Sequence, residues 1–307
     1  MRPNYRRKAR RRATRWGYLF LIPLIVIFGA FTAWPVVASL VYGFFNWDGV
    51  GLPHNFVGLN NFTEALSSGS FWNAFDNSFL FSLGVLLIEL PLALCMALVL
   101  NNAFLRGRNL YRLAIFLPVV ATTAVIGIVM AVLLSPVGGL VNNVLLTVGL
   151  INQPVNFLGD PHVALPTLIA IYIWKGFGIT VIYWLAALQT VPKELYEAAR
   201  IDGASARQQL LQITLPVMTP IAVVIVLLCF QRSLNTFDLV QATTAGGPVY
   251  STDVIPTYIY RYAFNPDLGA PRYGFASAVG VIFGLLTLAI TLLQSLLVSN
   301  RRKRATS

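Results

Sequence analysis

Residues 197–216 read EAARIDGASARQQLLQITLP, a polar, helix-forming stretch between two long apolar segments. Each flanking segment, 164–188 and 214–236, is long and apolar enough to cross a bilayer core, which takes about 20 residues in a helix. Four further segments have the same character: 17–43, 75–100, 111–134 and 273–298. The pattern therefore predicts an all-α membrane protein with six transmembrane helices, in which this stretch belongs to the connection between the fourth and fifth.

The composition agrees with a membrane protein. Of the 307 residues, 57% are hydrophobic and 11% are charged, whereas soluble domains carry about 25% charged residues. The net charge of +11 could suggest a nucleic-acid partner, but Lys and Arg gather at the two ends and in two short loops. Such clusters are typical of orientation signals in membrane proteins, so no nucleic acid is expected.

The apolar segments fit one membrane domain. The first segment follows a basic tail, but it is too long for a signal peptide and lacks a small-residue cleavage site, so we expect a retained anchor. No interval is long enough for a separate soluble domain. The sequence therefore predicts a basic tail at 1–16, a single six-span domain at 17–298 with its polar loop at 189–215, and a basic tail at 299–307.

Lys and Arg outside the predicted spans are divided unequally between the two sides. Eighteen of them lie in the tails and in the loops 101–112 and 189–213, while only Arg261 and Arg272 lie in the alternate loops. Loops rich in Lys and Arg stay in the cytoplasm. Both termini and the polar loop are therefore predicted to be cytoplasmic.

The polar loop has the features of two short helices joined by a turn. Pro192 suits the first position of a helix, where its missing N–H costs nothing. Asp202 and Gly203 form a turn dipeptide that should end this helix. Ser205 can cap a second helix, which should end at Pro216 before the next span. The residues alone fit either a docking knob for another protein or an ordinary interfacial turn.

The spacing in this loop resembles the signature of permease subunits in bacterial ATP-binding-cassette importers. Glu-Ala-Ala is followed after three residues by Gly, and after nine more by Ile-x-Leu-Pro. The resemblance implies a cytoplasmic coupling helix that docks into a cleft of a separate ATP-hydrolysing subunit. The docking residues that it implies are Glu197, Ala198, Ala199, Asp202 and Gly203.

Other stretches resemble the carbohydrate branch of that family, close to its maltose-type and glycerol-phosphate-type permeases. They are NFVGLNNFTEAL at 55–66, IWKGFGITVIYWLAALQTVPKELYEAARIDGA at 173–204, FDLVQATTAGGP at 237–248 and TDVIPTYIYRYAF at 252–264. One departure is Ala245, where the family usually has Gly. The resemblance implies a multi-pass subunit of the bacterial cytoplasmic membrane that imports an oligosaccharide or related sugar by alternating access.

The resemblance also implies partners. They are a second, related permease in a heterodimer, two ATP-binding subunits and an extracytoplasmic sugar-binding protein. The alternatives are an importer permease for another solute class, such as an amino acid or phosphate, and an ion-coupled secondary transporter. The sequence has no phosphate-binding loop and no metal-ligand cluster, so we expect no catalytic residue, metal or cofactor here, with ATP bound by the partner subunit.

Three charged residues fall inside the predicted spans: Glu89, Lys175 and Arg232. A charge within the membrane is costly, and it usually marks either a functional site or a mutual pair. Glu89 could therefore neutralise one of the two cations, and a long cation could also reach toward the membrane surface.

The resemblance to the maltose-type permease places substrate contacts on the spans that flank the coupling loop. The polar or small positions that it implies are Tyr172, Lys175, Gly176, Arg232, Ser233 and Thr236, and two further positions, Ile179 and Cys229, are less polar than expected. Two cations along this path would suit a sugar with many acceptors, or one that carries a carboxylate or phosphate.

Overall fold

The computed structural model describes residues 18–102, 105–265 and 269–305. The described chain is helical apart from its loops and one isolated antiparallel bridge between Phe45 and Phe56. The predicted all-α class is therefore confirmed. The predicted N-terminal tail at 1–16 lies outside the described residues, whereas the last helix, α14 (Tyr273–Ala305), continues through most of the predicted C-terminal tail.

The chain forms two compact units. Unit 1 comprises Met1–Leu66 and Tyr262–Phe283, and unit 2 comprises Ser67–Arg261 and Gly284–Ser307. The boundaries between them fall within α13 (Ile255–Phe264) and α14, so these two helices contribute to both units.

Five helical stretches of the described chain are long and apolar enough to cross a membrane. They match the first, second, fourth, fifth and sixth predicted spans: Tyr18–Tyr42, Gly69–Asn101, Ala164–Leu188, Ala206–Thr243 and Tyr273–Gln294. The first of these includes a π-helical turn, η1 (Gly29–Ala33), followed by α2 (Trp34–Tyr42).

The third predicted span, 111–134, is broken rather than straight. It consists of α5 (Arg108–Val120) and α6 (Thr123–Leu133), which are bent by 94° relative to each other. The backbone is extended at Thr122, with φ −65° and ψ 146°, and Pro118 removes one hydrogen bond from the last turn of α5. Because 13 helical residues reach about 20 Å, α5 alone is too short for a hydrocarbon core of about 30 Å. A sixth span therefore exists only if the bent pair is counted as one.

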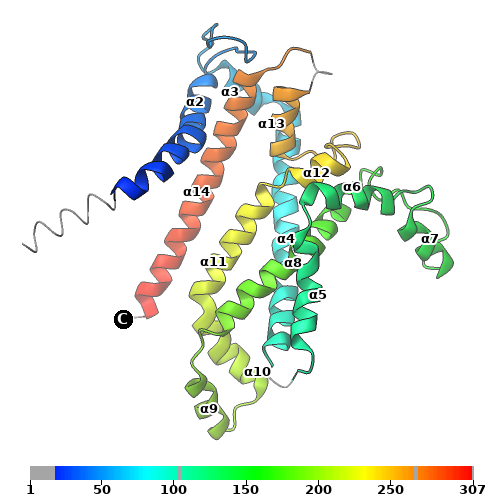
Figure 1. Cartoon of the computed structure of the whole chain (residues 1–307), viewed down its shortest axis with the longest axis vertical. Helices are drawn as coiled ribbons and strands as arrows, with labels where there is room; N and C mark the ends of the chain where they lie inside the picture. Colours follow the sequence, from blue (N-terminus) through cyan, green and yellow to red (C-terminus); the bar gives the residue numbers. More distant parts are fainter. Residues whose placement is uncertain (1–17, 103–104, 266–268, 306–307) are drawn as a thin grey trace, which may run out of the picture. The chain divides into compact units, whose positions relative to one another are not determined.

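The core of unit 2 is a bundle of α4 (Gly69–Asn101), α8 (Ala164–Leu188) and α11 (Leu215–Leu234), with α5 packed on α8 (Figure 1). Helix α8 is the most buried of the candidate spans and is apolar around most of its circumference, as expected for a central helix. Ala93 and Ala97 of α4 are fully buried in a cluster that includes Met218 of α11. Such small side chains let the helix backbones approach closely.

The opposite end of unit 2 from α9 carries shorter helices (Figure 1): α7 (Leu140–Thr147) and α12 (Asp238–Thr243), with α6 packed on α12. The amide of Asn142 donates to Val155 O at 3.0 Å, and Val155 N–H donates back at 2.8 Å, which fixes α7. Before α13, Asp253 is paired with Arg261 at 2.7 Å. Burial raises the pKa of the Asp253 carboxyl, and the Arg261 guanidinium opposes this shift.

Unit 1 contains α2, most of α3 (Asn60–Ser67) and the first part of α14. The buried side chain of Asn61 donates to Gly43 O at 3.0 Å and to Phe45 O at 2.9 Å, and so ties α3 to the chain after α2. Arg272 donates to both carboxylate oxygens of Glu64, at 2.8 and 2.6 Å.

Candidate functional site

The predicted two-helix loop is present at one end of unit 2. Its first helix, α9 (Lys193–Ile201), begins directly after Pro192, which is the N-cap and not the first helical residue. Gly203 has a left-handed φ of +77°. Its N–H donates to Arg200 O at 3.1 Å, and Ala204 N–H donates to Ala199 O at 2.8 Å. This pair of bonds is a Schellman motif, which favours Gly at the left-handed position, so the predicted turn is confirmed.

The second helix, α10 (Ala206–Gln209), begins with the predicted cap. The Ser205 hydroxyl accepts from Gln208 N–H, and Ser205 N–H donates to the Gln208 side chain at 2.7 Å, which completes a capping box. The prediction that this helix ends at Pro216 was wrong. A π-helical turn, η2 (Leu210–Thr214), joins α10 to α11 without a break, and Leu215 N–H donates to Leu210 O. The wider turn accommodates Pro216, which lacks an N–H, at the start of α11.

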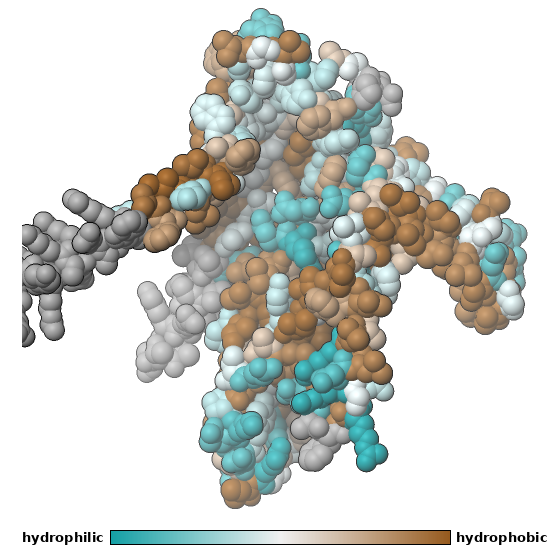
Figure 2. Space-filling model, viewed as in Figure 1, coloured by the Kyte–Doolittle hydropathy of each residue, from teal (hydrophilic) through white to brown (hydrophobic). Residues whose placement is uncertain are grey.

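The two helices form a compact knob, residues 193–214, at the ends of α8 and α11 (Figure 1). The Tyr196 hydroxyl lies 2.8 Å from Thr214 Oγ1, so α9 is tied to η2. Tyr196, Glu197 and Arg200 border a pocket of about 640 Å³ that also reaches the ends of α4 and α8. Figure 2 shows hydrophilic residues gathered over this end of unit 2, with hydrophobic surface above them.

The knob presents the residues that the family signature implies. Four of them are exposed and Ala199 is half-buried. Ile201, an apolar side chain beside them, is 87% exposed. A large apolar side chain at such exposure, on a segment fixed by two capping motifs, has the character of a docking surface.

A buried polar cluster lies within the bundle, about the predicted intramembrane charges. Glu89 of α4 is fully buried, and its Oε1 lies 2.7 Å from Nη2 of Arg232 of α11. The Thr180 hydroxyl of α8 donates to the same Glu89 oxygen, and Arg232 Nη2 lies 3.3 Å from Thr180 Oγ1. Three helices therefore meet at one carboxylate, and Glu89 pairs with Arg232, one of the two partners considered for it.

Two of the predicted substrate-path residues of α8 lie beside Arg232 in this cluster. Tyr172 and Gly176 lie on one face of the helix, spaced by four residues. The Arg232 guanidinium carbon is 5.6 Å from the centre of the Tyr172 ring. A Cβ at position 176 would lie 3.1 Å from Arg232 Nη2, so the glycine leaves room for the guanidinium. The structure thus brings Tyr172, Gly176 and Arg232 together.

The other predicted substrate-path residues are placed differently. Lys175 is half-buried and has no carboxylate within 4.0 Å in the described parts of the chain, although Arg232 and Asp238 are charged groups that act on it. Ser233 is fully buried and its hydroxyl donates to Phe230 O at 2.9 Å, within its own helix. Thr236 is buried just beyond the end of α11.

The sequence reasoning missed Thr180, which is hydrogen-bonded to both members of the ion pair. The signal was available, because Tyr172, Gly176 and Thr180 recur at intervals of four on one helical face. Cys229, whose Sγ is 3.7 Å from Thr180 Oγ1, belongs to the same cluster.

The cluster keeps unused hydrogen-bonding capacity. Among the residues that the structure describes, Glu89 Oε2 and Arg232 Nε are buried atoms without a hydrogen-bond partner. Buried polar atoms are nearly always paired, and exceptions are commonly functional. The Arg232 side chain is 29% exposed while the Glu89 side chain has no exposure, so the cation forms the accessible side of the pair.

Comparison with known proteins gives the family. Residues 89–303 match the model of the family described as "Binding-protein-dependent transport system inner membrane component". This match covers more than half of the chain and includes α8, α11, the knob and the second part of α4. The chain therefore belongs to this family of multi-pass membrane permeases, whose members are transport subunits and not themselves enzymes.

Two curated relatives of high similarity are permeases of sugar transport systems. The lactose transport system permease protein LacF of Rhizobium radiobacter is 32% identical over 280 residues, which cover 91% of this chain and 92% of that protein. The trehalose/maltose transport system permease protein MalF of Thermococcus litoralis is 32% identical over 290 residues, which cover 94% and 95%.

Solved structures show the same fold. A chain of a bacterial ABC transporter involved in the import of the acidic polysaccharide alginate has a TM-score of 0.81 and 29% identity, covering 96% of this chain and 99% of that chain. A bacterial alginate ABC transporter in complex with an alginate pentasaccharide-bound periplasmic protein gives a TM-score of 0.74 at 28% identity, with coverages of 92% and 93%. These findings do not favour the alternatives of another solute class or an ion-coupled secondary transporter.

Proposed function

We propose that this chain is a transmembrane subunit of an ATP-driven importer for a carbohydrate, and that the 193–214 knob couples it to a separate ATP-hydrolysing subunit. The observation that carries the proposal is the knob itself. Its exposed Glu197, Ala198 and Gly203, on a segment fixed by a Schellman motif and a capping box, lie directly at the ends of two spans. A rigid attachment of this kind can pass a displacement from a docked motor into the bundle.

The orientation and the partners are part of the same proposal. The concentration of Lys and Arg in the tails and in the loops 101–112 and 189–213 supports a cytoplasmic position for the knob and both termini. The partners are two ATP-binding subunits, which bind the ATP, a second related permease, and an extracytoplasmic sugar-binding protein. A binding-protein partner is supported by the solved alginate transporter, which is in complex with a periplasmic protein. No cofactor, metal or catalytic residue is proposed for this chain.

The polar cluster is proposed to border the substrate path. Arg232 Nε is an unused donor, and Lys175 has no carboxylate partner within the described chain. Arg232 is already paired with Glu89, whereas a cation without a partner within a membrane bundle is costly, so a ligand with acceptor groups would stabilise Lys175 above all. This arrangement suits a sugar rich in hydroxyl acceptors or one that carries a carboxylate or phosphate.

The coupling assignment is tested by substitutions on the knob that spare the bundle. Glu197→Lys reverses a charge at the proposed docking surface, and Gly203→Pro removes both the left-handed φ and the N–H bonded to Arg200 O. Both variants are expected to reach the membrane in normal amounts but to lose sugar uptake and sugar-stimulated ATP hydrolysis by the assembled transporter.

Two matched controls separate docking from simple damage. Glu194→Lys makes the same charge reversal on the same helix, at a position outside the signature. Gly203→Asn replaces the glycine with a residue that also tolerates the left-handed region. Both controls are expected to retain most uptake. Uptake at the wild-type rate in Glu197→Lys or Gly203→Pro would refute the coupling role.

A further inference from the structure

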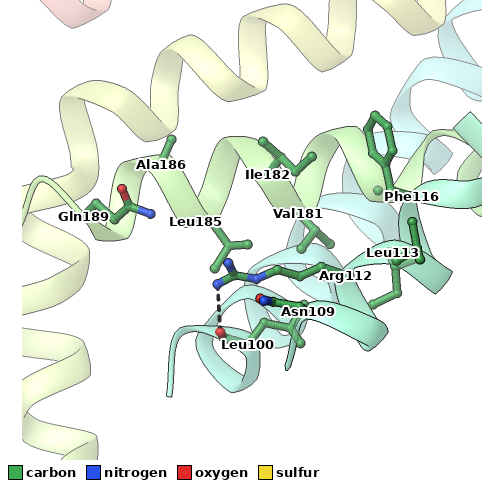
Figure 3. A pocket seen from close by; sticks show the side chains of 12 residues that line it. Leu100, Asn109, Arg112, Leu113, Phe116, Val181, Ile182, Leu185, Ala186 and Gln189 are labelled. Carbon is green, nitrogen blue, oxygen red and sulfur yellow. Dashed lines mark hydrogen bonds between the residues drawn. The ribbon is translucent and has the colours of Figure 1, made fainter. Parts of the chain in front are cut away.

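A second pocket lies between α5 and α8, at the side of the bundle (Figure 3). Its volume is about 520 Å³, and it shares only Gln189 with the pocket beneath the knob. None of the proposed substrate-path or coupling residues lines it. Gly178 lines the pocket. A Cβ at this position would lie 2.7 Å from Ile115 O, so the glycine permits the close approach of α5 to α8.

The pocket is amphiphilic. Apolar side chains of α5 and α8 form most of its wall, including Leu113, Phe116 and Ile182 (Figure 3). The polar side chains that line it are those of Asn109, Arg112 and Gln189, and no acidic residue is among them.

Arg112 supplies the charge of this pocket. Its Nη2 donates to Leu100 O at 3.1 Å, which holds the guanidinium against the end of α4 (Figure 3). Its Nε is buried and has no hydrogen-bond partner in the described chain. A guanidinium held in place in this way, with no carboxylate in the lining, is complementary to a phosphate group.

The position of the pocket along its helices fits the level at which a lipid headgroup and an acyl chain meet. Its polar residues are at the start of α5 and the end of α8, next to the basic loop 101–112, while its apolar wall continues toward the middle of the spans. Leu113 is 62% exposed and Ile182 is 47% exposed, so this wall is open to the surroundings of the bundle.

We propose that the pocket binds an anionic phospholipid of the leaflet next to loop 101–112, which is the cytoplasmic leaflet in the proposed orientation. The headgroup phosphate accepts hydrogen bonds from Arg112, and one acyl chain lies along Leu113, Phe116 and Ile182. The N-terminal end of α5, whose N-cap Gly107 has no side chain to cap it, adds a favourable field for the anion. Basic side chains near the membrane surface attract anionic lipids in the same way.

The test uses the assembled transporter in detergent, titrated with phosphatidylglycerol or phosphatidylcholine of equal chain length and followed by native mass spectrometry. Phosphatidylglycerol is expected to bind in preference. Arg112→Gln should weaken its binding about fivefold, the effect of one basic side chain near the anionic surface. Arg108→Gln is the matched control, since it removes the same charge from an exposed position of the same loop outside the pocket, and it should change binding little.

A third variant separates the pocket from its charge. Ile182→Trp fills the apolar wall while keeping Arg112, and it should also reduce phosphatidylglycerol binding. Glycerol phosphate, a headgroup without acyl chains, should not compete. Equal losses in the Arg112 and Arg108 variants, or no preference between the two lipids, would overturn the proposal. Effective competition by glycerol phosphate would assign the pocket to a soluble anion, and cross-linking of a cysteine at 182 to the second permease, with no bound lipid, would assign it to a subunit contact.

Discussion

The sharpest prediction concerns the ion pair between Glu89 and Arg232. Arg232→Met removes the guanidinium and leaves a fully buried carboxylate with only the Thr180 hydroxyl as its donor. Because Glu89 Oε2 already lacks a partner within the described residues, no second donor is in place to compensate. Breaking a buried ion pair in this way costs about 3–5 kcal/mol. At roughly 2–4 °C per kcal/mol for a unit of this size, the thermal midpoint should fall by about 6–20 °C.

A double-mutant cycle tests whether the ion pair between Glu89 and Arg232 stabilises the bundle. Glu89→Gln in the Arg232→Met background removes the stranded charge, so it should restore most of the thermal midpoint and of the detergent-solubilised yield. Lys175→Met is the control, because Lys175 has no carboxylate within 4.0 Å in the described chain, and its yield should be normal. An unchanged thermal midpoint in Arg232→Met, or no recovery in the double variant, would show that the pair does not stabilise the bundle. Rescue of both yield and uptake in the double variant would further reject a substrate role for Arg232, whereas recovered yield with lost, sugar-dependent uptake would support that role.

Three other predictions address the topology, the ion pair between Asp253 and Arg261, and the packing of α5 on α8. In a chain in which Cys95 and Cys229 are replaced, cysteines at positions 60 and 150 should react with an impermeant reagent in intact cells, and one at 205 should react only from inside; labelling of 205 from outside would overturn the proposed orientation. Arg261→Met should destabilise the protein more at about pH 8 than at about pH 5. Burial raises the pKa of the Asp253 carboxyl, and loss of the opposing guanidinium raises that pKa further, so stability is lost as the pH rises through it. Thermal unfolding should lose this pH dependence when Asp253→Asn is added, and an equal effect at both pH values would contradict the reasoning. Gly178→Ala should cost about 1–3 kcal/mol, because the new Cβ would meet the α5 backbone, whereas Gly284→Ala, with nothing within 4 Å, should be tolerated.

The sequence predicted the helical class and five of the spans because each is a long apolar run with a nearby break. It did not predict the bend after α5, since 113–134 is apolar apart from the two neutral threonines at 122–123, and hydropathy does not report the extended backbone at Thr122. The continuous path from α10 into α11 was also missed. Pro216 is a strong local signal for a helix end, but a π-helical turn accommodates it, and such a turn has no clear sequence signature.

Some parts of the candidate site could be predicted from the sequence and others could not. The turn at Gly203 and the cap at Ser205 depend on local backbone chemistry, so both followed from neighbouring residues. The sequence identified Glu89 as a partner for a cation but left two cations open, because a choice between them needs the packing of α4 against α11. The roles of the docking and substrate-path residues remain predictions, since they concern contacts with other molecules.

The uninterrupted helix from Ala206 to Leu234 has a mechanical consequence. At 1.5 Å per residue it is a rod of roughly 40 Å, with the knob at one end and Arg232 near the other. A tilt of about 10° around its midpoint would move each end by about 3.5 Å, by the same geometry. An ion pair needs its charged atoms within about 4 Å, and Arg232 lies 2.7 Å from Glu89. A tilt of this size that is directed away from α4 would therefore separate the pair if both side chains keep their rotamers. The guanidinium would then be free for a ligand in one position of the rod and withdrawn in the other, which would make the affinity of the path depend on the stroke of the motor.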